Sequence, residues 1–238
     1  MNATRARPAP AQVYEIQGRR VTLPATVRDA SAGNAMFMVP AVVAQRLVGN
    51  AFDVIELAPN QAQLILGFVD YRDNDLGNYN EAMIVFMVRP RGSSAGDGTF
   101  IYKLPVDQSF TCEAGRRIWG FPKSVGVIDI DYASDRATCR LVMDGQHVFT
   151  LSVPRRTVEM GDGRDTEMTT YTYLDGAAAV PFTTGGGTAV VSAPEGVELH
   201  LGAHPLADEL RTLGLPAPPL MSMWTEHMHG FFSAPRKL

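Results

Sequence analysis

The chain has 238 residues, a net charge of −4 and 45% hydrophobic residues, which is enough apolar material for one domain with a sizeable core. Its mild acidity argues against an electrostatic grip on nucleic acid or on an anionic membrane. No apolar run approaches the roughly 18 residues that a membrane-spanning helix needs. We therefore expect neither nucleic acid nor a membrane as a partner.

The N-terminal residues 1–12, MNATRARPAPAQ, include arginines but lack the apolar stretch of a secretory signal. We expect a flexible arm there, followed by a single domain over residues 13–238. Cys112 and Cys139 are the only cysteines, and no metal-ligand spacing connects them, which is typical of buried thiols in a reducing compartment. The expected localisation is cytoplasmic.

Two segments predict short peripheral helices. The first, MVPAVVAQRLVG at residues 38–49, should end at Gly49. The second, HPLADELRTLGLP at residues 204–216, has Pro205 where a first helical turn accepts proline, and Gly214 follows as a stop signal.

Strand patterns dominate the rest of the chain, as short β-branched or aromatic runs bounded by Gly, Pro, Asp or Asn. They cover residues 61–71, 82–90, 98–106, 125–132, 137–145, 147–154, 170–176 and 188–194. Several alternate between apolar and polar residues, which is typical of antiparallel sheets with one wet face. We expect a mainly β (α+β) fold: a closed or cone-like antiparallel β-barrel, or a double sheet, with a few peripheral helices.

The motif WTEHMHG raises the question of a metal site. His227 and His229 lie two residues apart, so on a strand both side chains would face the same way, as metal ligands can. The chain has five histidines, and no spacing identifies a third ligand. We expect no metal and no other cofactor.

The segment GRRIWGFPKSVG, residues 115–126, places one lysine, Lys123, among apolar residues and directly after Pro122, which restricts the backbone. An amine must be neutral to attack a carbonyl, and either removal from water or a neighbouring cation lowers the pKa of a lysine. Trp119 and Phe121 can exclude water, and Arg116 and Arg117 lie close in sequence. On the residues alone, a lysine that reaches solvent beside a turn is the more common interpretation.

Resemblance to a known family changes this balance. GRRIWGFPKSVG resembles the lysine segment of the acetoacetate decarboxylase family, whose lysine forms a Schiff base after activation by desolvation or a nearby cation. LGNYNEAMI, residues 76–84, resembles the family's Leu-Gly-x-Tyr-x-Glu segment and implies an acid–base role for Glu81. YEIQGRRVTLPATVRDA, residues 14–30, is similar to the N-terminal strand that carries a substrate-facing arginine. Arg19 is the first choice for that arginine, and Arg20 is the competitor.

Two positions depart from the family pattern. In the decarboxylase proper a second lysine directly follows the nucleophile, and here that position is Ser124. A further family glutamate falls at Leu66. The contribution of an adjacent cation is therefore lost unless Arg116 or Arg117 replaces it, so we expect burial to carry more of the amine's activation.

The resemblance implies a Schiff-base-forming lyase that acts on small keto acids, and it also implies a homo-oligomer. Lys123 and Glu81 are the expected catalytic residues. Arg19 and Arg116, with Trp119 and Phe121 as pocket walls, are the expected substrate-binding residues. Decarboxylation of acetoacetate or another β-keto acid is one reaction, and pyruvate-dependent aldol condensation with dehydration is another. A non-catalytic β domain that binds a small molecule is the third possibility.

Overall fold

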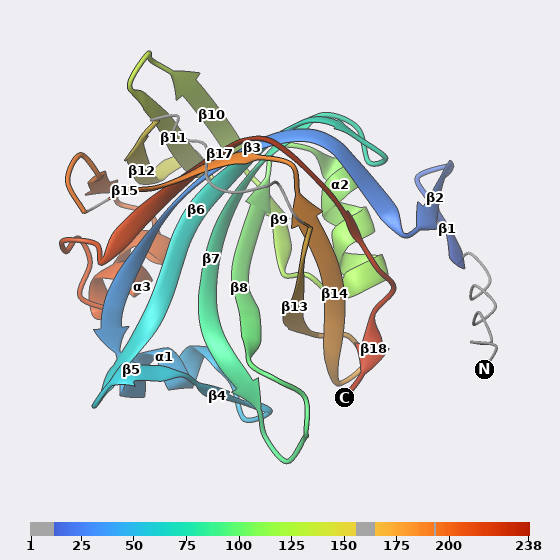
Figure 1. Cartoon of the computed structure of the whole chain (residues 1–238), viewed down its shortest axis with the longest axis horizontal. Coiled ribbons are helices and arrows are strands. Elements are labelled where there is room, and N and C mark those ends of the chain that lie inside the picture. The colour runs from blue at the N-terminus through green and yellow to red at the C-terminus, as the bar shows by residue number, and fades with distance from the viewer. Residues whose placement is uncertain (1–11, 156–164, 193) are drawn as a thin grey trace, which may run out of the picture.

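The computed structural model describes residues 12–155, 165–192 and 194–238, with side chains omitted for 188–192. A closed seven-stranded β-barrel forms its centre (Figure 1). Its strands, in spatial order, are β17 (Met221–Phe232), β3 (Ala25–Pro40), β6 (Gln61–Asn74), β7 (Tyr79–Pro90), β8 (Gly98–Val106), β13 (Thr166–Tyr173) and β14 (Ala177–Gly185). Pairing of β14 with β17 closes the ring. The mainly β fold and the closed barrel are thus confirmed.

The barrel is mixed rather than wholly antiparallel, because β8 and β13 run parallel. Between these two strands the chain leaves the barrel, forms a helix and most of a second sheet, and then returns in the same direction. A parallel neighbour requires such a long connection, whereas an antiparallel neighbour requires only a turn. The sequence patterns of the single strands do not indicate which strands pair or whether a pair is parallel.

A second sheet packs against the outside of the barrel. Its antiparallel strands are β10 (Val127–Tyr132), β11 (Arg136–Met143), β12 (Gln146–Pro154) and β16 (Glu198–Leu201). Buried side chains such as Phe149 and Leu151 of β12 pack with Phe37 and Phe68 of the barrel in one apolar cluster. This cluster fixes the outer face of β3 and β6, which leaves the inner face of these strands to line the barrel interior.

Shorter strands complete the sheets. They are β1 (Gln12–Ile16), β2 (Arg19–Leu23), β4 (Phe52–Val54), β5 (Glu56–Ala58), β9 (Lys123–Val125), β15 (Thr188–Ser192) and β18 (Arg236–Lys237). The hairpin β1–β2 lies on the side of the barrel opposite the second sheet (Figure 1). Residues 1–11 of the expected N-terminal arm lie outside the described residues, and Gln12 already belongs to β1.

In the part of the chain that the structure describes, three short α-helices lie around the barrel. Helix α1 (Ala41–Val48) ends at Gly49 and α3 (Pro205–Thr212) begins with proline, so both predicted helices are confirmed. Helix α2 (Ser109–Ala114) was not predicted, and it continues directly into a π-helical segment, Gly115–Trp119. No helix within the described ranges is long and apolar enough to cross a membrane.

Candidate active site

The barrel encloses a cavity of about 680 Å³. Inward-facing side chains of the barrel strands, of β9 and of the π-helical segment line it. On β6, for example, Ile65, Val69 and Tyr71 face the cavity, whereas Leu64 and Leu66 face the outer apolar cluster. The period of two along a strand therefore assigns alternate residues to the cavity and to the core.

Lys123 and Glu81 meet on the wall of this cavity. Nζ of Lys123 lies 2.7 Å from Oε2 of Glu81, and their side chains are only 4% and 8% exposed. Glu81 belongs to β7, and Lys123 opens β9, which pairs in parallel with β8 at Leu104. The two residues are 42 positions apart in sequence, so the sheet, not the local chain, brings them together. We call them the reactive pair.

The reactive pair can interconvert between two states of equal net charge. In one state an ammonium faces a carboxylate, and in the other Glu81 has taken the proton and Lys123 is a free amine. The separation of 2.7 Å is short enough for a proton to pass between the two groups.

Two tyrosines surround the pair and remain protonated. The Tyr71 hydroxyl donates a hydrogen bond of 3.4 Å to Oε1 of Glu81, and the Tyr79 ring lies 4.8 Å from Nζ of Lys123. Burial, followed by the negative charge of Glu81, raises the pKa of both phenols well above the usual value. Both hydroxyls are therefore hydrogen-bond donors across the physiological pH range, and neither adds a charge to the site.

Gly115 gives the lysine its path into the cavity. A Cβ atom on Gly115 would lie 2.5 Å from Cδ and 2.7 Å from Cε of Lys123, closer than side chains pack. The methylene chain of Lys123 thus runs directly over the backbone at the start of the π-helical segment. Such π-helical turns are frequent at functional sites. Gly120 ends the segment in the left-handed region, with φ of 69°, where glycine is favoured.

Trp119 and Phe121 form part of the cavity wall beside the reactive pair. Their rings stack with centroids 5.8 Å apart, and Phe232 of β17 packs against both. The indole Nε1 of Trp119 donates to the carbonyl of Ser233 at 2.9 Å, which holds the ring in place. The structure thus brings both predicted aromatic residues to the cavity that holds Lys123.

The predicted arginines lie elsewhere. Arg19 and Arg20 are exposed on the hairpin, where the Arg19 guanidinium lies 3.8 Å from the centre of the Phe110 ring. Arg116 is exposed on the outer side of the π-helical segment, and Arg117 pairs with Glu113 one turn earlier. None of these four arginines is among the residues that line the cavity. The structure therefore does not bring Arg19 or Arg116 to the reactive pair. Neither arginine replaces the second lysine of the family pattern, whose position Ser124 occupies.

Leu66, where the further family glutamate is expected to fall, does not line the cavity. Leu66 is fully buried in the outer apolar cluster, and its neighbour Ile65 lines the cavity instead. Because neighbouring residues of a strand face opposite sides of the sheet, a shift of one residue decides whether a side chain faces the cavity or the outer core. Lys103 of β8 is likewise absent from the cavity wall, and its Nζ lies 4.6 Å from the ring of Tyr102.

The two histidines considered as metal ligands bond to separate carboxylates. His227 Nδ1 lies 3.1 Å from Asp29, and His229 Nε2 lies 3.2 Å from Asp165. Within the described ranges, no cluster of three His, Cys, Asp or Glu residues is placed to hold a metal ion. Cys112 and Cys139 are both buried and free.

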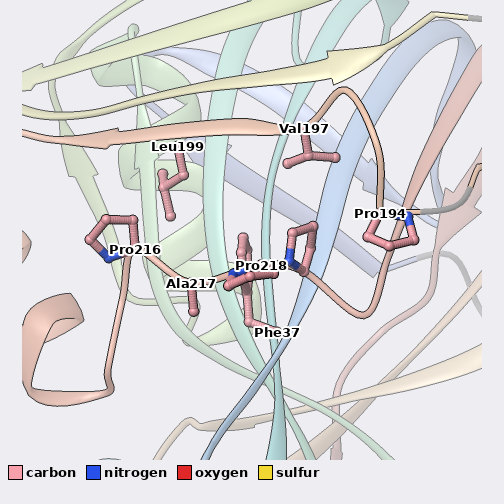
Figure 2. A pocket seen from close by; sticks show the side chains of 8 residues that line it. Phe37, Pro194, Val197, Leu199, Pro216, Ala217 and Pro218 are labelled. Carbon is pink, nitrogen blue, oxygen red and sulfur yellow. The ribbon is translucent and has the colours of Figure 1, made fainter.

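A second pocket, of about 390 Å³, lies between β3, β16 and the segment that follows α3 (Figure 2). Its lining consists of Phe37, Pro194, Val197, Leu199, Pro216, Ala217, Pro218 and Pro219. None of these described lining residues has an ionisable or nucleophilic side chain, so this pocket offers no group for covalent chemistry.

Sequence reasoning did not identify Tyr71 and Gly115 as site residues. Tyr71 reaches Glu81 only because β6 and β7 pair with Tyr71 opposite Tyr79. Gly115 was visible as the first residue of the lysine segment, but its contact with Lys123 depends on the π-helical turn between them.

Comparisons with known proteins agree with this architecture. A family model described as acetoacetate decarboxylase (ADC) matches residues 14–225. An acetoacetate decarboxylase from Legionella pneumophila shares 15% identity, with 98% of this chain and 92% of that chain covered and a TM-score of 0.70. The enduracididine biosynthesis enzyme MppR, complexed with pyruvate, shares 15% identity over 90% of this chain and 89% of its own, with a TM-score of 0.63.

An acetoacetate decarboxylase-like enzyme from Sphingomonas wittichii RW1 shares 14% identity over 90% of this chain and 92% of its own, with a TM-score of 0.61. A search of curated protein sequences found no match. At these identities the solved structures support the fold, and the family model, which covers most of the sequence, supports the membership. The chain belongs to the acetoacetate decarboxylase family.

Proposed function

We propose that the protein is a lyase that decarboxylates a β-keto acid through an iminium formed on Lys123. The observation that carries this proposal is the buried contact of 2.7 Å between Lys123 and Glu81 inside a closed barrel. A lysine amine adjacent to a proton acceptor, with both side chains less than a tenth exposed, is the arrangement that Schiff-base chemistry requires.

Lys123 and Glu81 supply the nucleophile and the proton carrier for the steps of this reaction. Lys123 gives a proton to Glu81 and attacks the ketone carbon, and loss of water gives an iminium. The bond to the carboxylate carbon then breaks, its electron pair moves into the iminium, and carbon dioxide leaves an enamine behind. Glu81 gives its first proton to the departing water, takes up a second proton from solvent and delivers it to the enamine carbon. Water adds to the resulting iminium and releases the ketone product and the free amine.

The charge of the cavity favours decarboxylation over aldol chemistry. Lys123 is the only lysine or arginine among the described residues that line the cavity. A β-keto acid loses its carboxylate during the reaction, so a weakly held carboxylate lowers the barrier. Pyruvate keeps its carboxylate throughout an aldol reaction and gains from a fixed cation at every step.

Pyruvate-dependent aldol condensation with dehydration is the second candidate, because MppR, a structure of the same fold, is complexed with pyruvate. Both reactions begin with the same iminium. They differ in the next bond: a carbon–carboxylate bond breaks in one, and a carbon–hydrogen bond of the methyl group breaks in the other.

Two parallel assays separate the candidates. In the first, carbon dioxide release from acetoacetate is followed, and in the second, hydrogen–deuterium exchange at the methyl group of pyruvate is followed in heavy water. We expect carbon dioxide release to depend on the protein and to disappear in Lys123→Ala. Methyl exchange without carbon dioxide release would favour the aldol reaction, and neither signal would favour a non-catalytic binding domain. The expected homo-oligomer stays a prediction, which the mass of the protein in solution would test.

A further inference from the structure

The barrel cavity is much larger than acetoacetate requires. A protein cavity of about 150 Å³ accommodates benzene, which has six heavy atoms, and acetoacetate has seven. The cavity of about 680 Å³ therefore has several times the volume that a four-carbon keto acid fills, and it falls in the range of pockets for drug-sized ligands. A small substrate would leave most of the apolar wall in contact with water.

The excess volume lies along the barrel strands, away from the reactive pair. The register of β7 with its neighbours arranges the wall in layers. Glu81 is level with Val69, the next inward residue Met83 is level with Gly67, and Val85 is level with Ile65. Val85 lies four positions beyond Glu81 on the strand, which at about 3.4 Å per residue is a length of roughly 14 Å.

The wall of these outer layers is apolar and adaptable. We define the apolar compartment as the part of the cavity lined by Met36, Ile65, Met83, Val85, Ile101 and Met223. Polar groups at this end of the cavity are the amide of Asn34 and, one layer beyond Val85, the hydroxyls of Thr99 and Thr170, which bond to each other. Methionine side chains are flexible and polarisable, so they follow the shape of an apolar ligand closely. The described part of this wall holds no lysine or arginine that could bind a second carboxylate.

From the volume, the layering and the lining we propose that the substrate is a 3-oxo acid whose ketone carries an apolar chain of about five to eight carbons. The ketone carbon meets Nζ of Lys123, and the chain fills the apolar compartment along β7. The acetic arm with its carboxylate stays beside the reactive pair, where the carbon–carbon bond breaks. This inference rests on the proposed decarboxylation and specifies its substrate.

The first test uses the wild-type protein and straight-chain substrates: acetoacetate, 3-oxohexanoate, 3-oxooctanoate and 3-oxodecanoate. Each methylene that leaves water for an apolar wall raises kcat/KM by up to about fourfold, from the transfer free energy of one methylene. We expect kcat/KM to rise at least tenfold from acetoacetate to 3-oxooctanoate. Equal or falling values along the series would overturn the inference.

The second test narrows the apolar compartment. Val85 is 5% exposed and lines the cavity, so Val85→Phe places a ring where the chain would lie. The ratio of kcat/KM for 3-oxooctanoate to that for acetoacetate should fall at least tenfold. The matched control is Val42→Phe, the same change on helix α1, where Val42 is 62% exposed and outside the cavity. An unchanged ratio in Val85→Phe would contradict the inference. The wild-type series decides the question if this variant does not fold.

Borohydride trapping of each substrate distinguishes failure of this inference from failure of the proposed function. Adducts on Lys123 at every chain length, without preference, would refute the long-chain substrate and leave the lysine chemistry intact. No adduct at any length would refute the proposed function, and with it the assignment of a 3-oxo acid. A preference for the longer chains in both trapping and turnover would support both.

Discussion

Replacement of Gly115 by alanine tests whether the path of Lys123 over the helix backbone sets its reactivity. The new Cβ would lie 2.5 Å from Cδ of Lys123, whereas ordinary contacts begin at 3.4 Å, so the methylene chain must move by about 1 Å. Nζ of Lys123, which lies 2.7 Å from Oε2 of Glu81, would be displaced together with the methylene chain. A displacement of about 1 Å in a reacting group costs on the order of 10²-fold in rate.

The stability of this variant should change little. Gly115 has helical angles, φ −60° and ψ −41°, where glycine-to-alanine replacement stabilises a helix by roughly 0.5–1 kcal/mol. Overpacking against Lys123 costs about 1–3 kcal/mol, and a side chain that can move gives the lower end of that range. The two effects largely offset one another, so the variant should fold while its reaction slows.

The assay is the rate at which borohydride traps an acetoacetate adduct, read by intact mass, alongside urea unfolding. The control is Gly96→Ala, because a Cβ on Gly96 meets nothing within 4 Å. We expect a trapping rate about 10²-fold lower in Gly115→Ala than in the control, at similar stability. A wild-type trapping rate in a folded Gly115→Ala protein would show that this contact does not position the amine.

Four further substitutions address the remaining groups. Glu81→Gln should slow turnover by roughly 10²–10⁴, the usual contribution of a positioned acid or base, and unaltered turnover at saturating substrate would remove Glu81 from the mechanism. Trp119→Ala should admit water to the amine and slow borohydride trapping at pH 7. Arg116 is exposed, so Arg116→Ala should alter the trapping rate less than twofold, roughly the scale of a screened surface charge. A larger effect of the Arg116 substitution than of the Trp119 substitution would show that charge, not burial, activates the amine. Tyr71→Phe should lower the turnover number several-fold, because Glu81 loses the hydrogen bond from the Tyr71 hydroxyl. If no second substitution restores the wild-type pH profile, the effect is assigned to the lost hydroxyl.

Local signals predicted the parts of the fold that depend on local chemistry. Gly49 ends α1 and Pro205 begins α3, as their conformational preferences require. Strand β8 covers residues 98–106, the range that its glycine start and aromatic and β-branched residues indicated. Helix α2 was missed because it has only six residues and its N-cap residue, Gln108, makes no side-chain capping bond.

The site was predictable where a short motif carries it and not where the sheet register carries it. Lys123 and Glu81 lie in two recognisable segments, and the structure brings them into contact. The approach of Tyr71 depends on the pairing of two long strands, for which no single segment contains the information. Arg19 and Arg116 are close to those motifs in sequence, but the hairpin and the outer side of the π-helical segment turn them away from the cavity.

The identity of the lysine that bears the adduct tests the central claim most directly. Wild-type protein, Lys123→Ala and Lys103→Ala are each treated with acetoacetate and borohydride, and the modified peptide is mapped by mass. Lys103 is the matched control, because it lies on β8 and does not line the cavity. We predict one adduct per chain on Lys123 in the wild type and in Lys103→Ala, and none in Lys123→Ala. An adduct on another lysine, or an undiminished adduct in Lys123→Ala, would contradict the account.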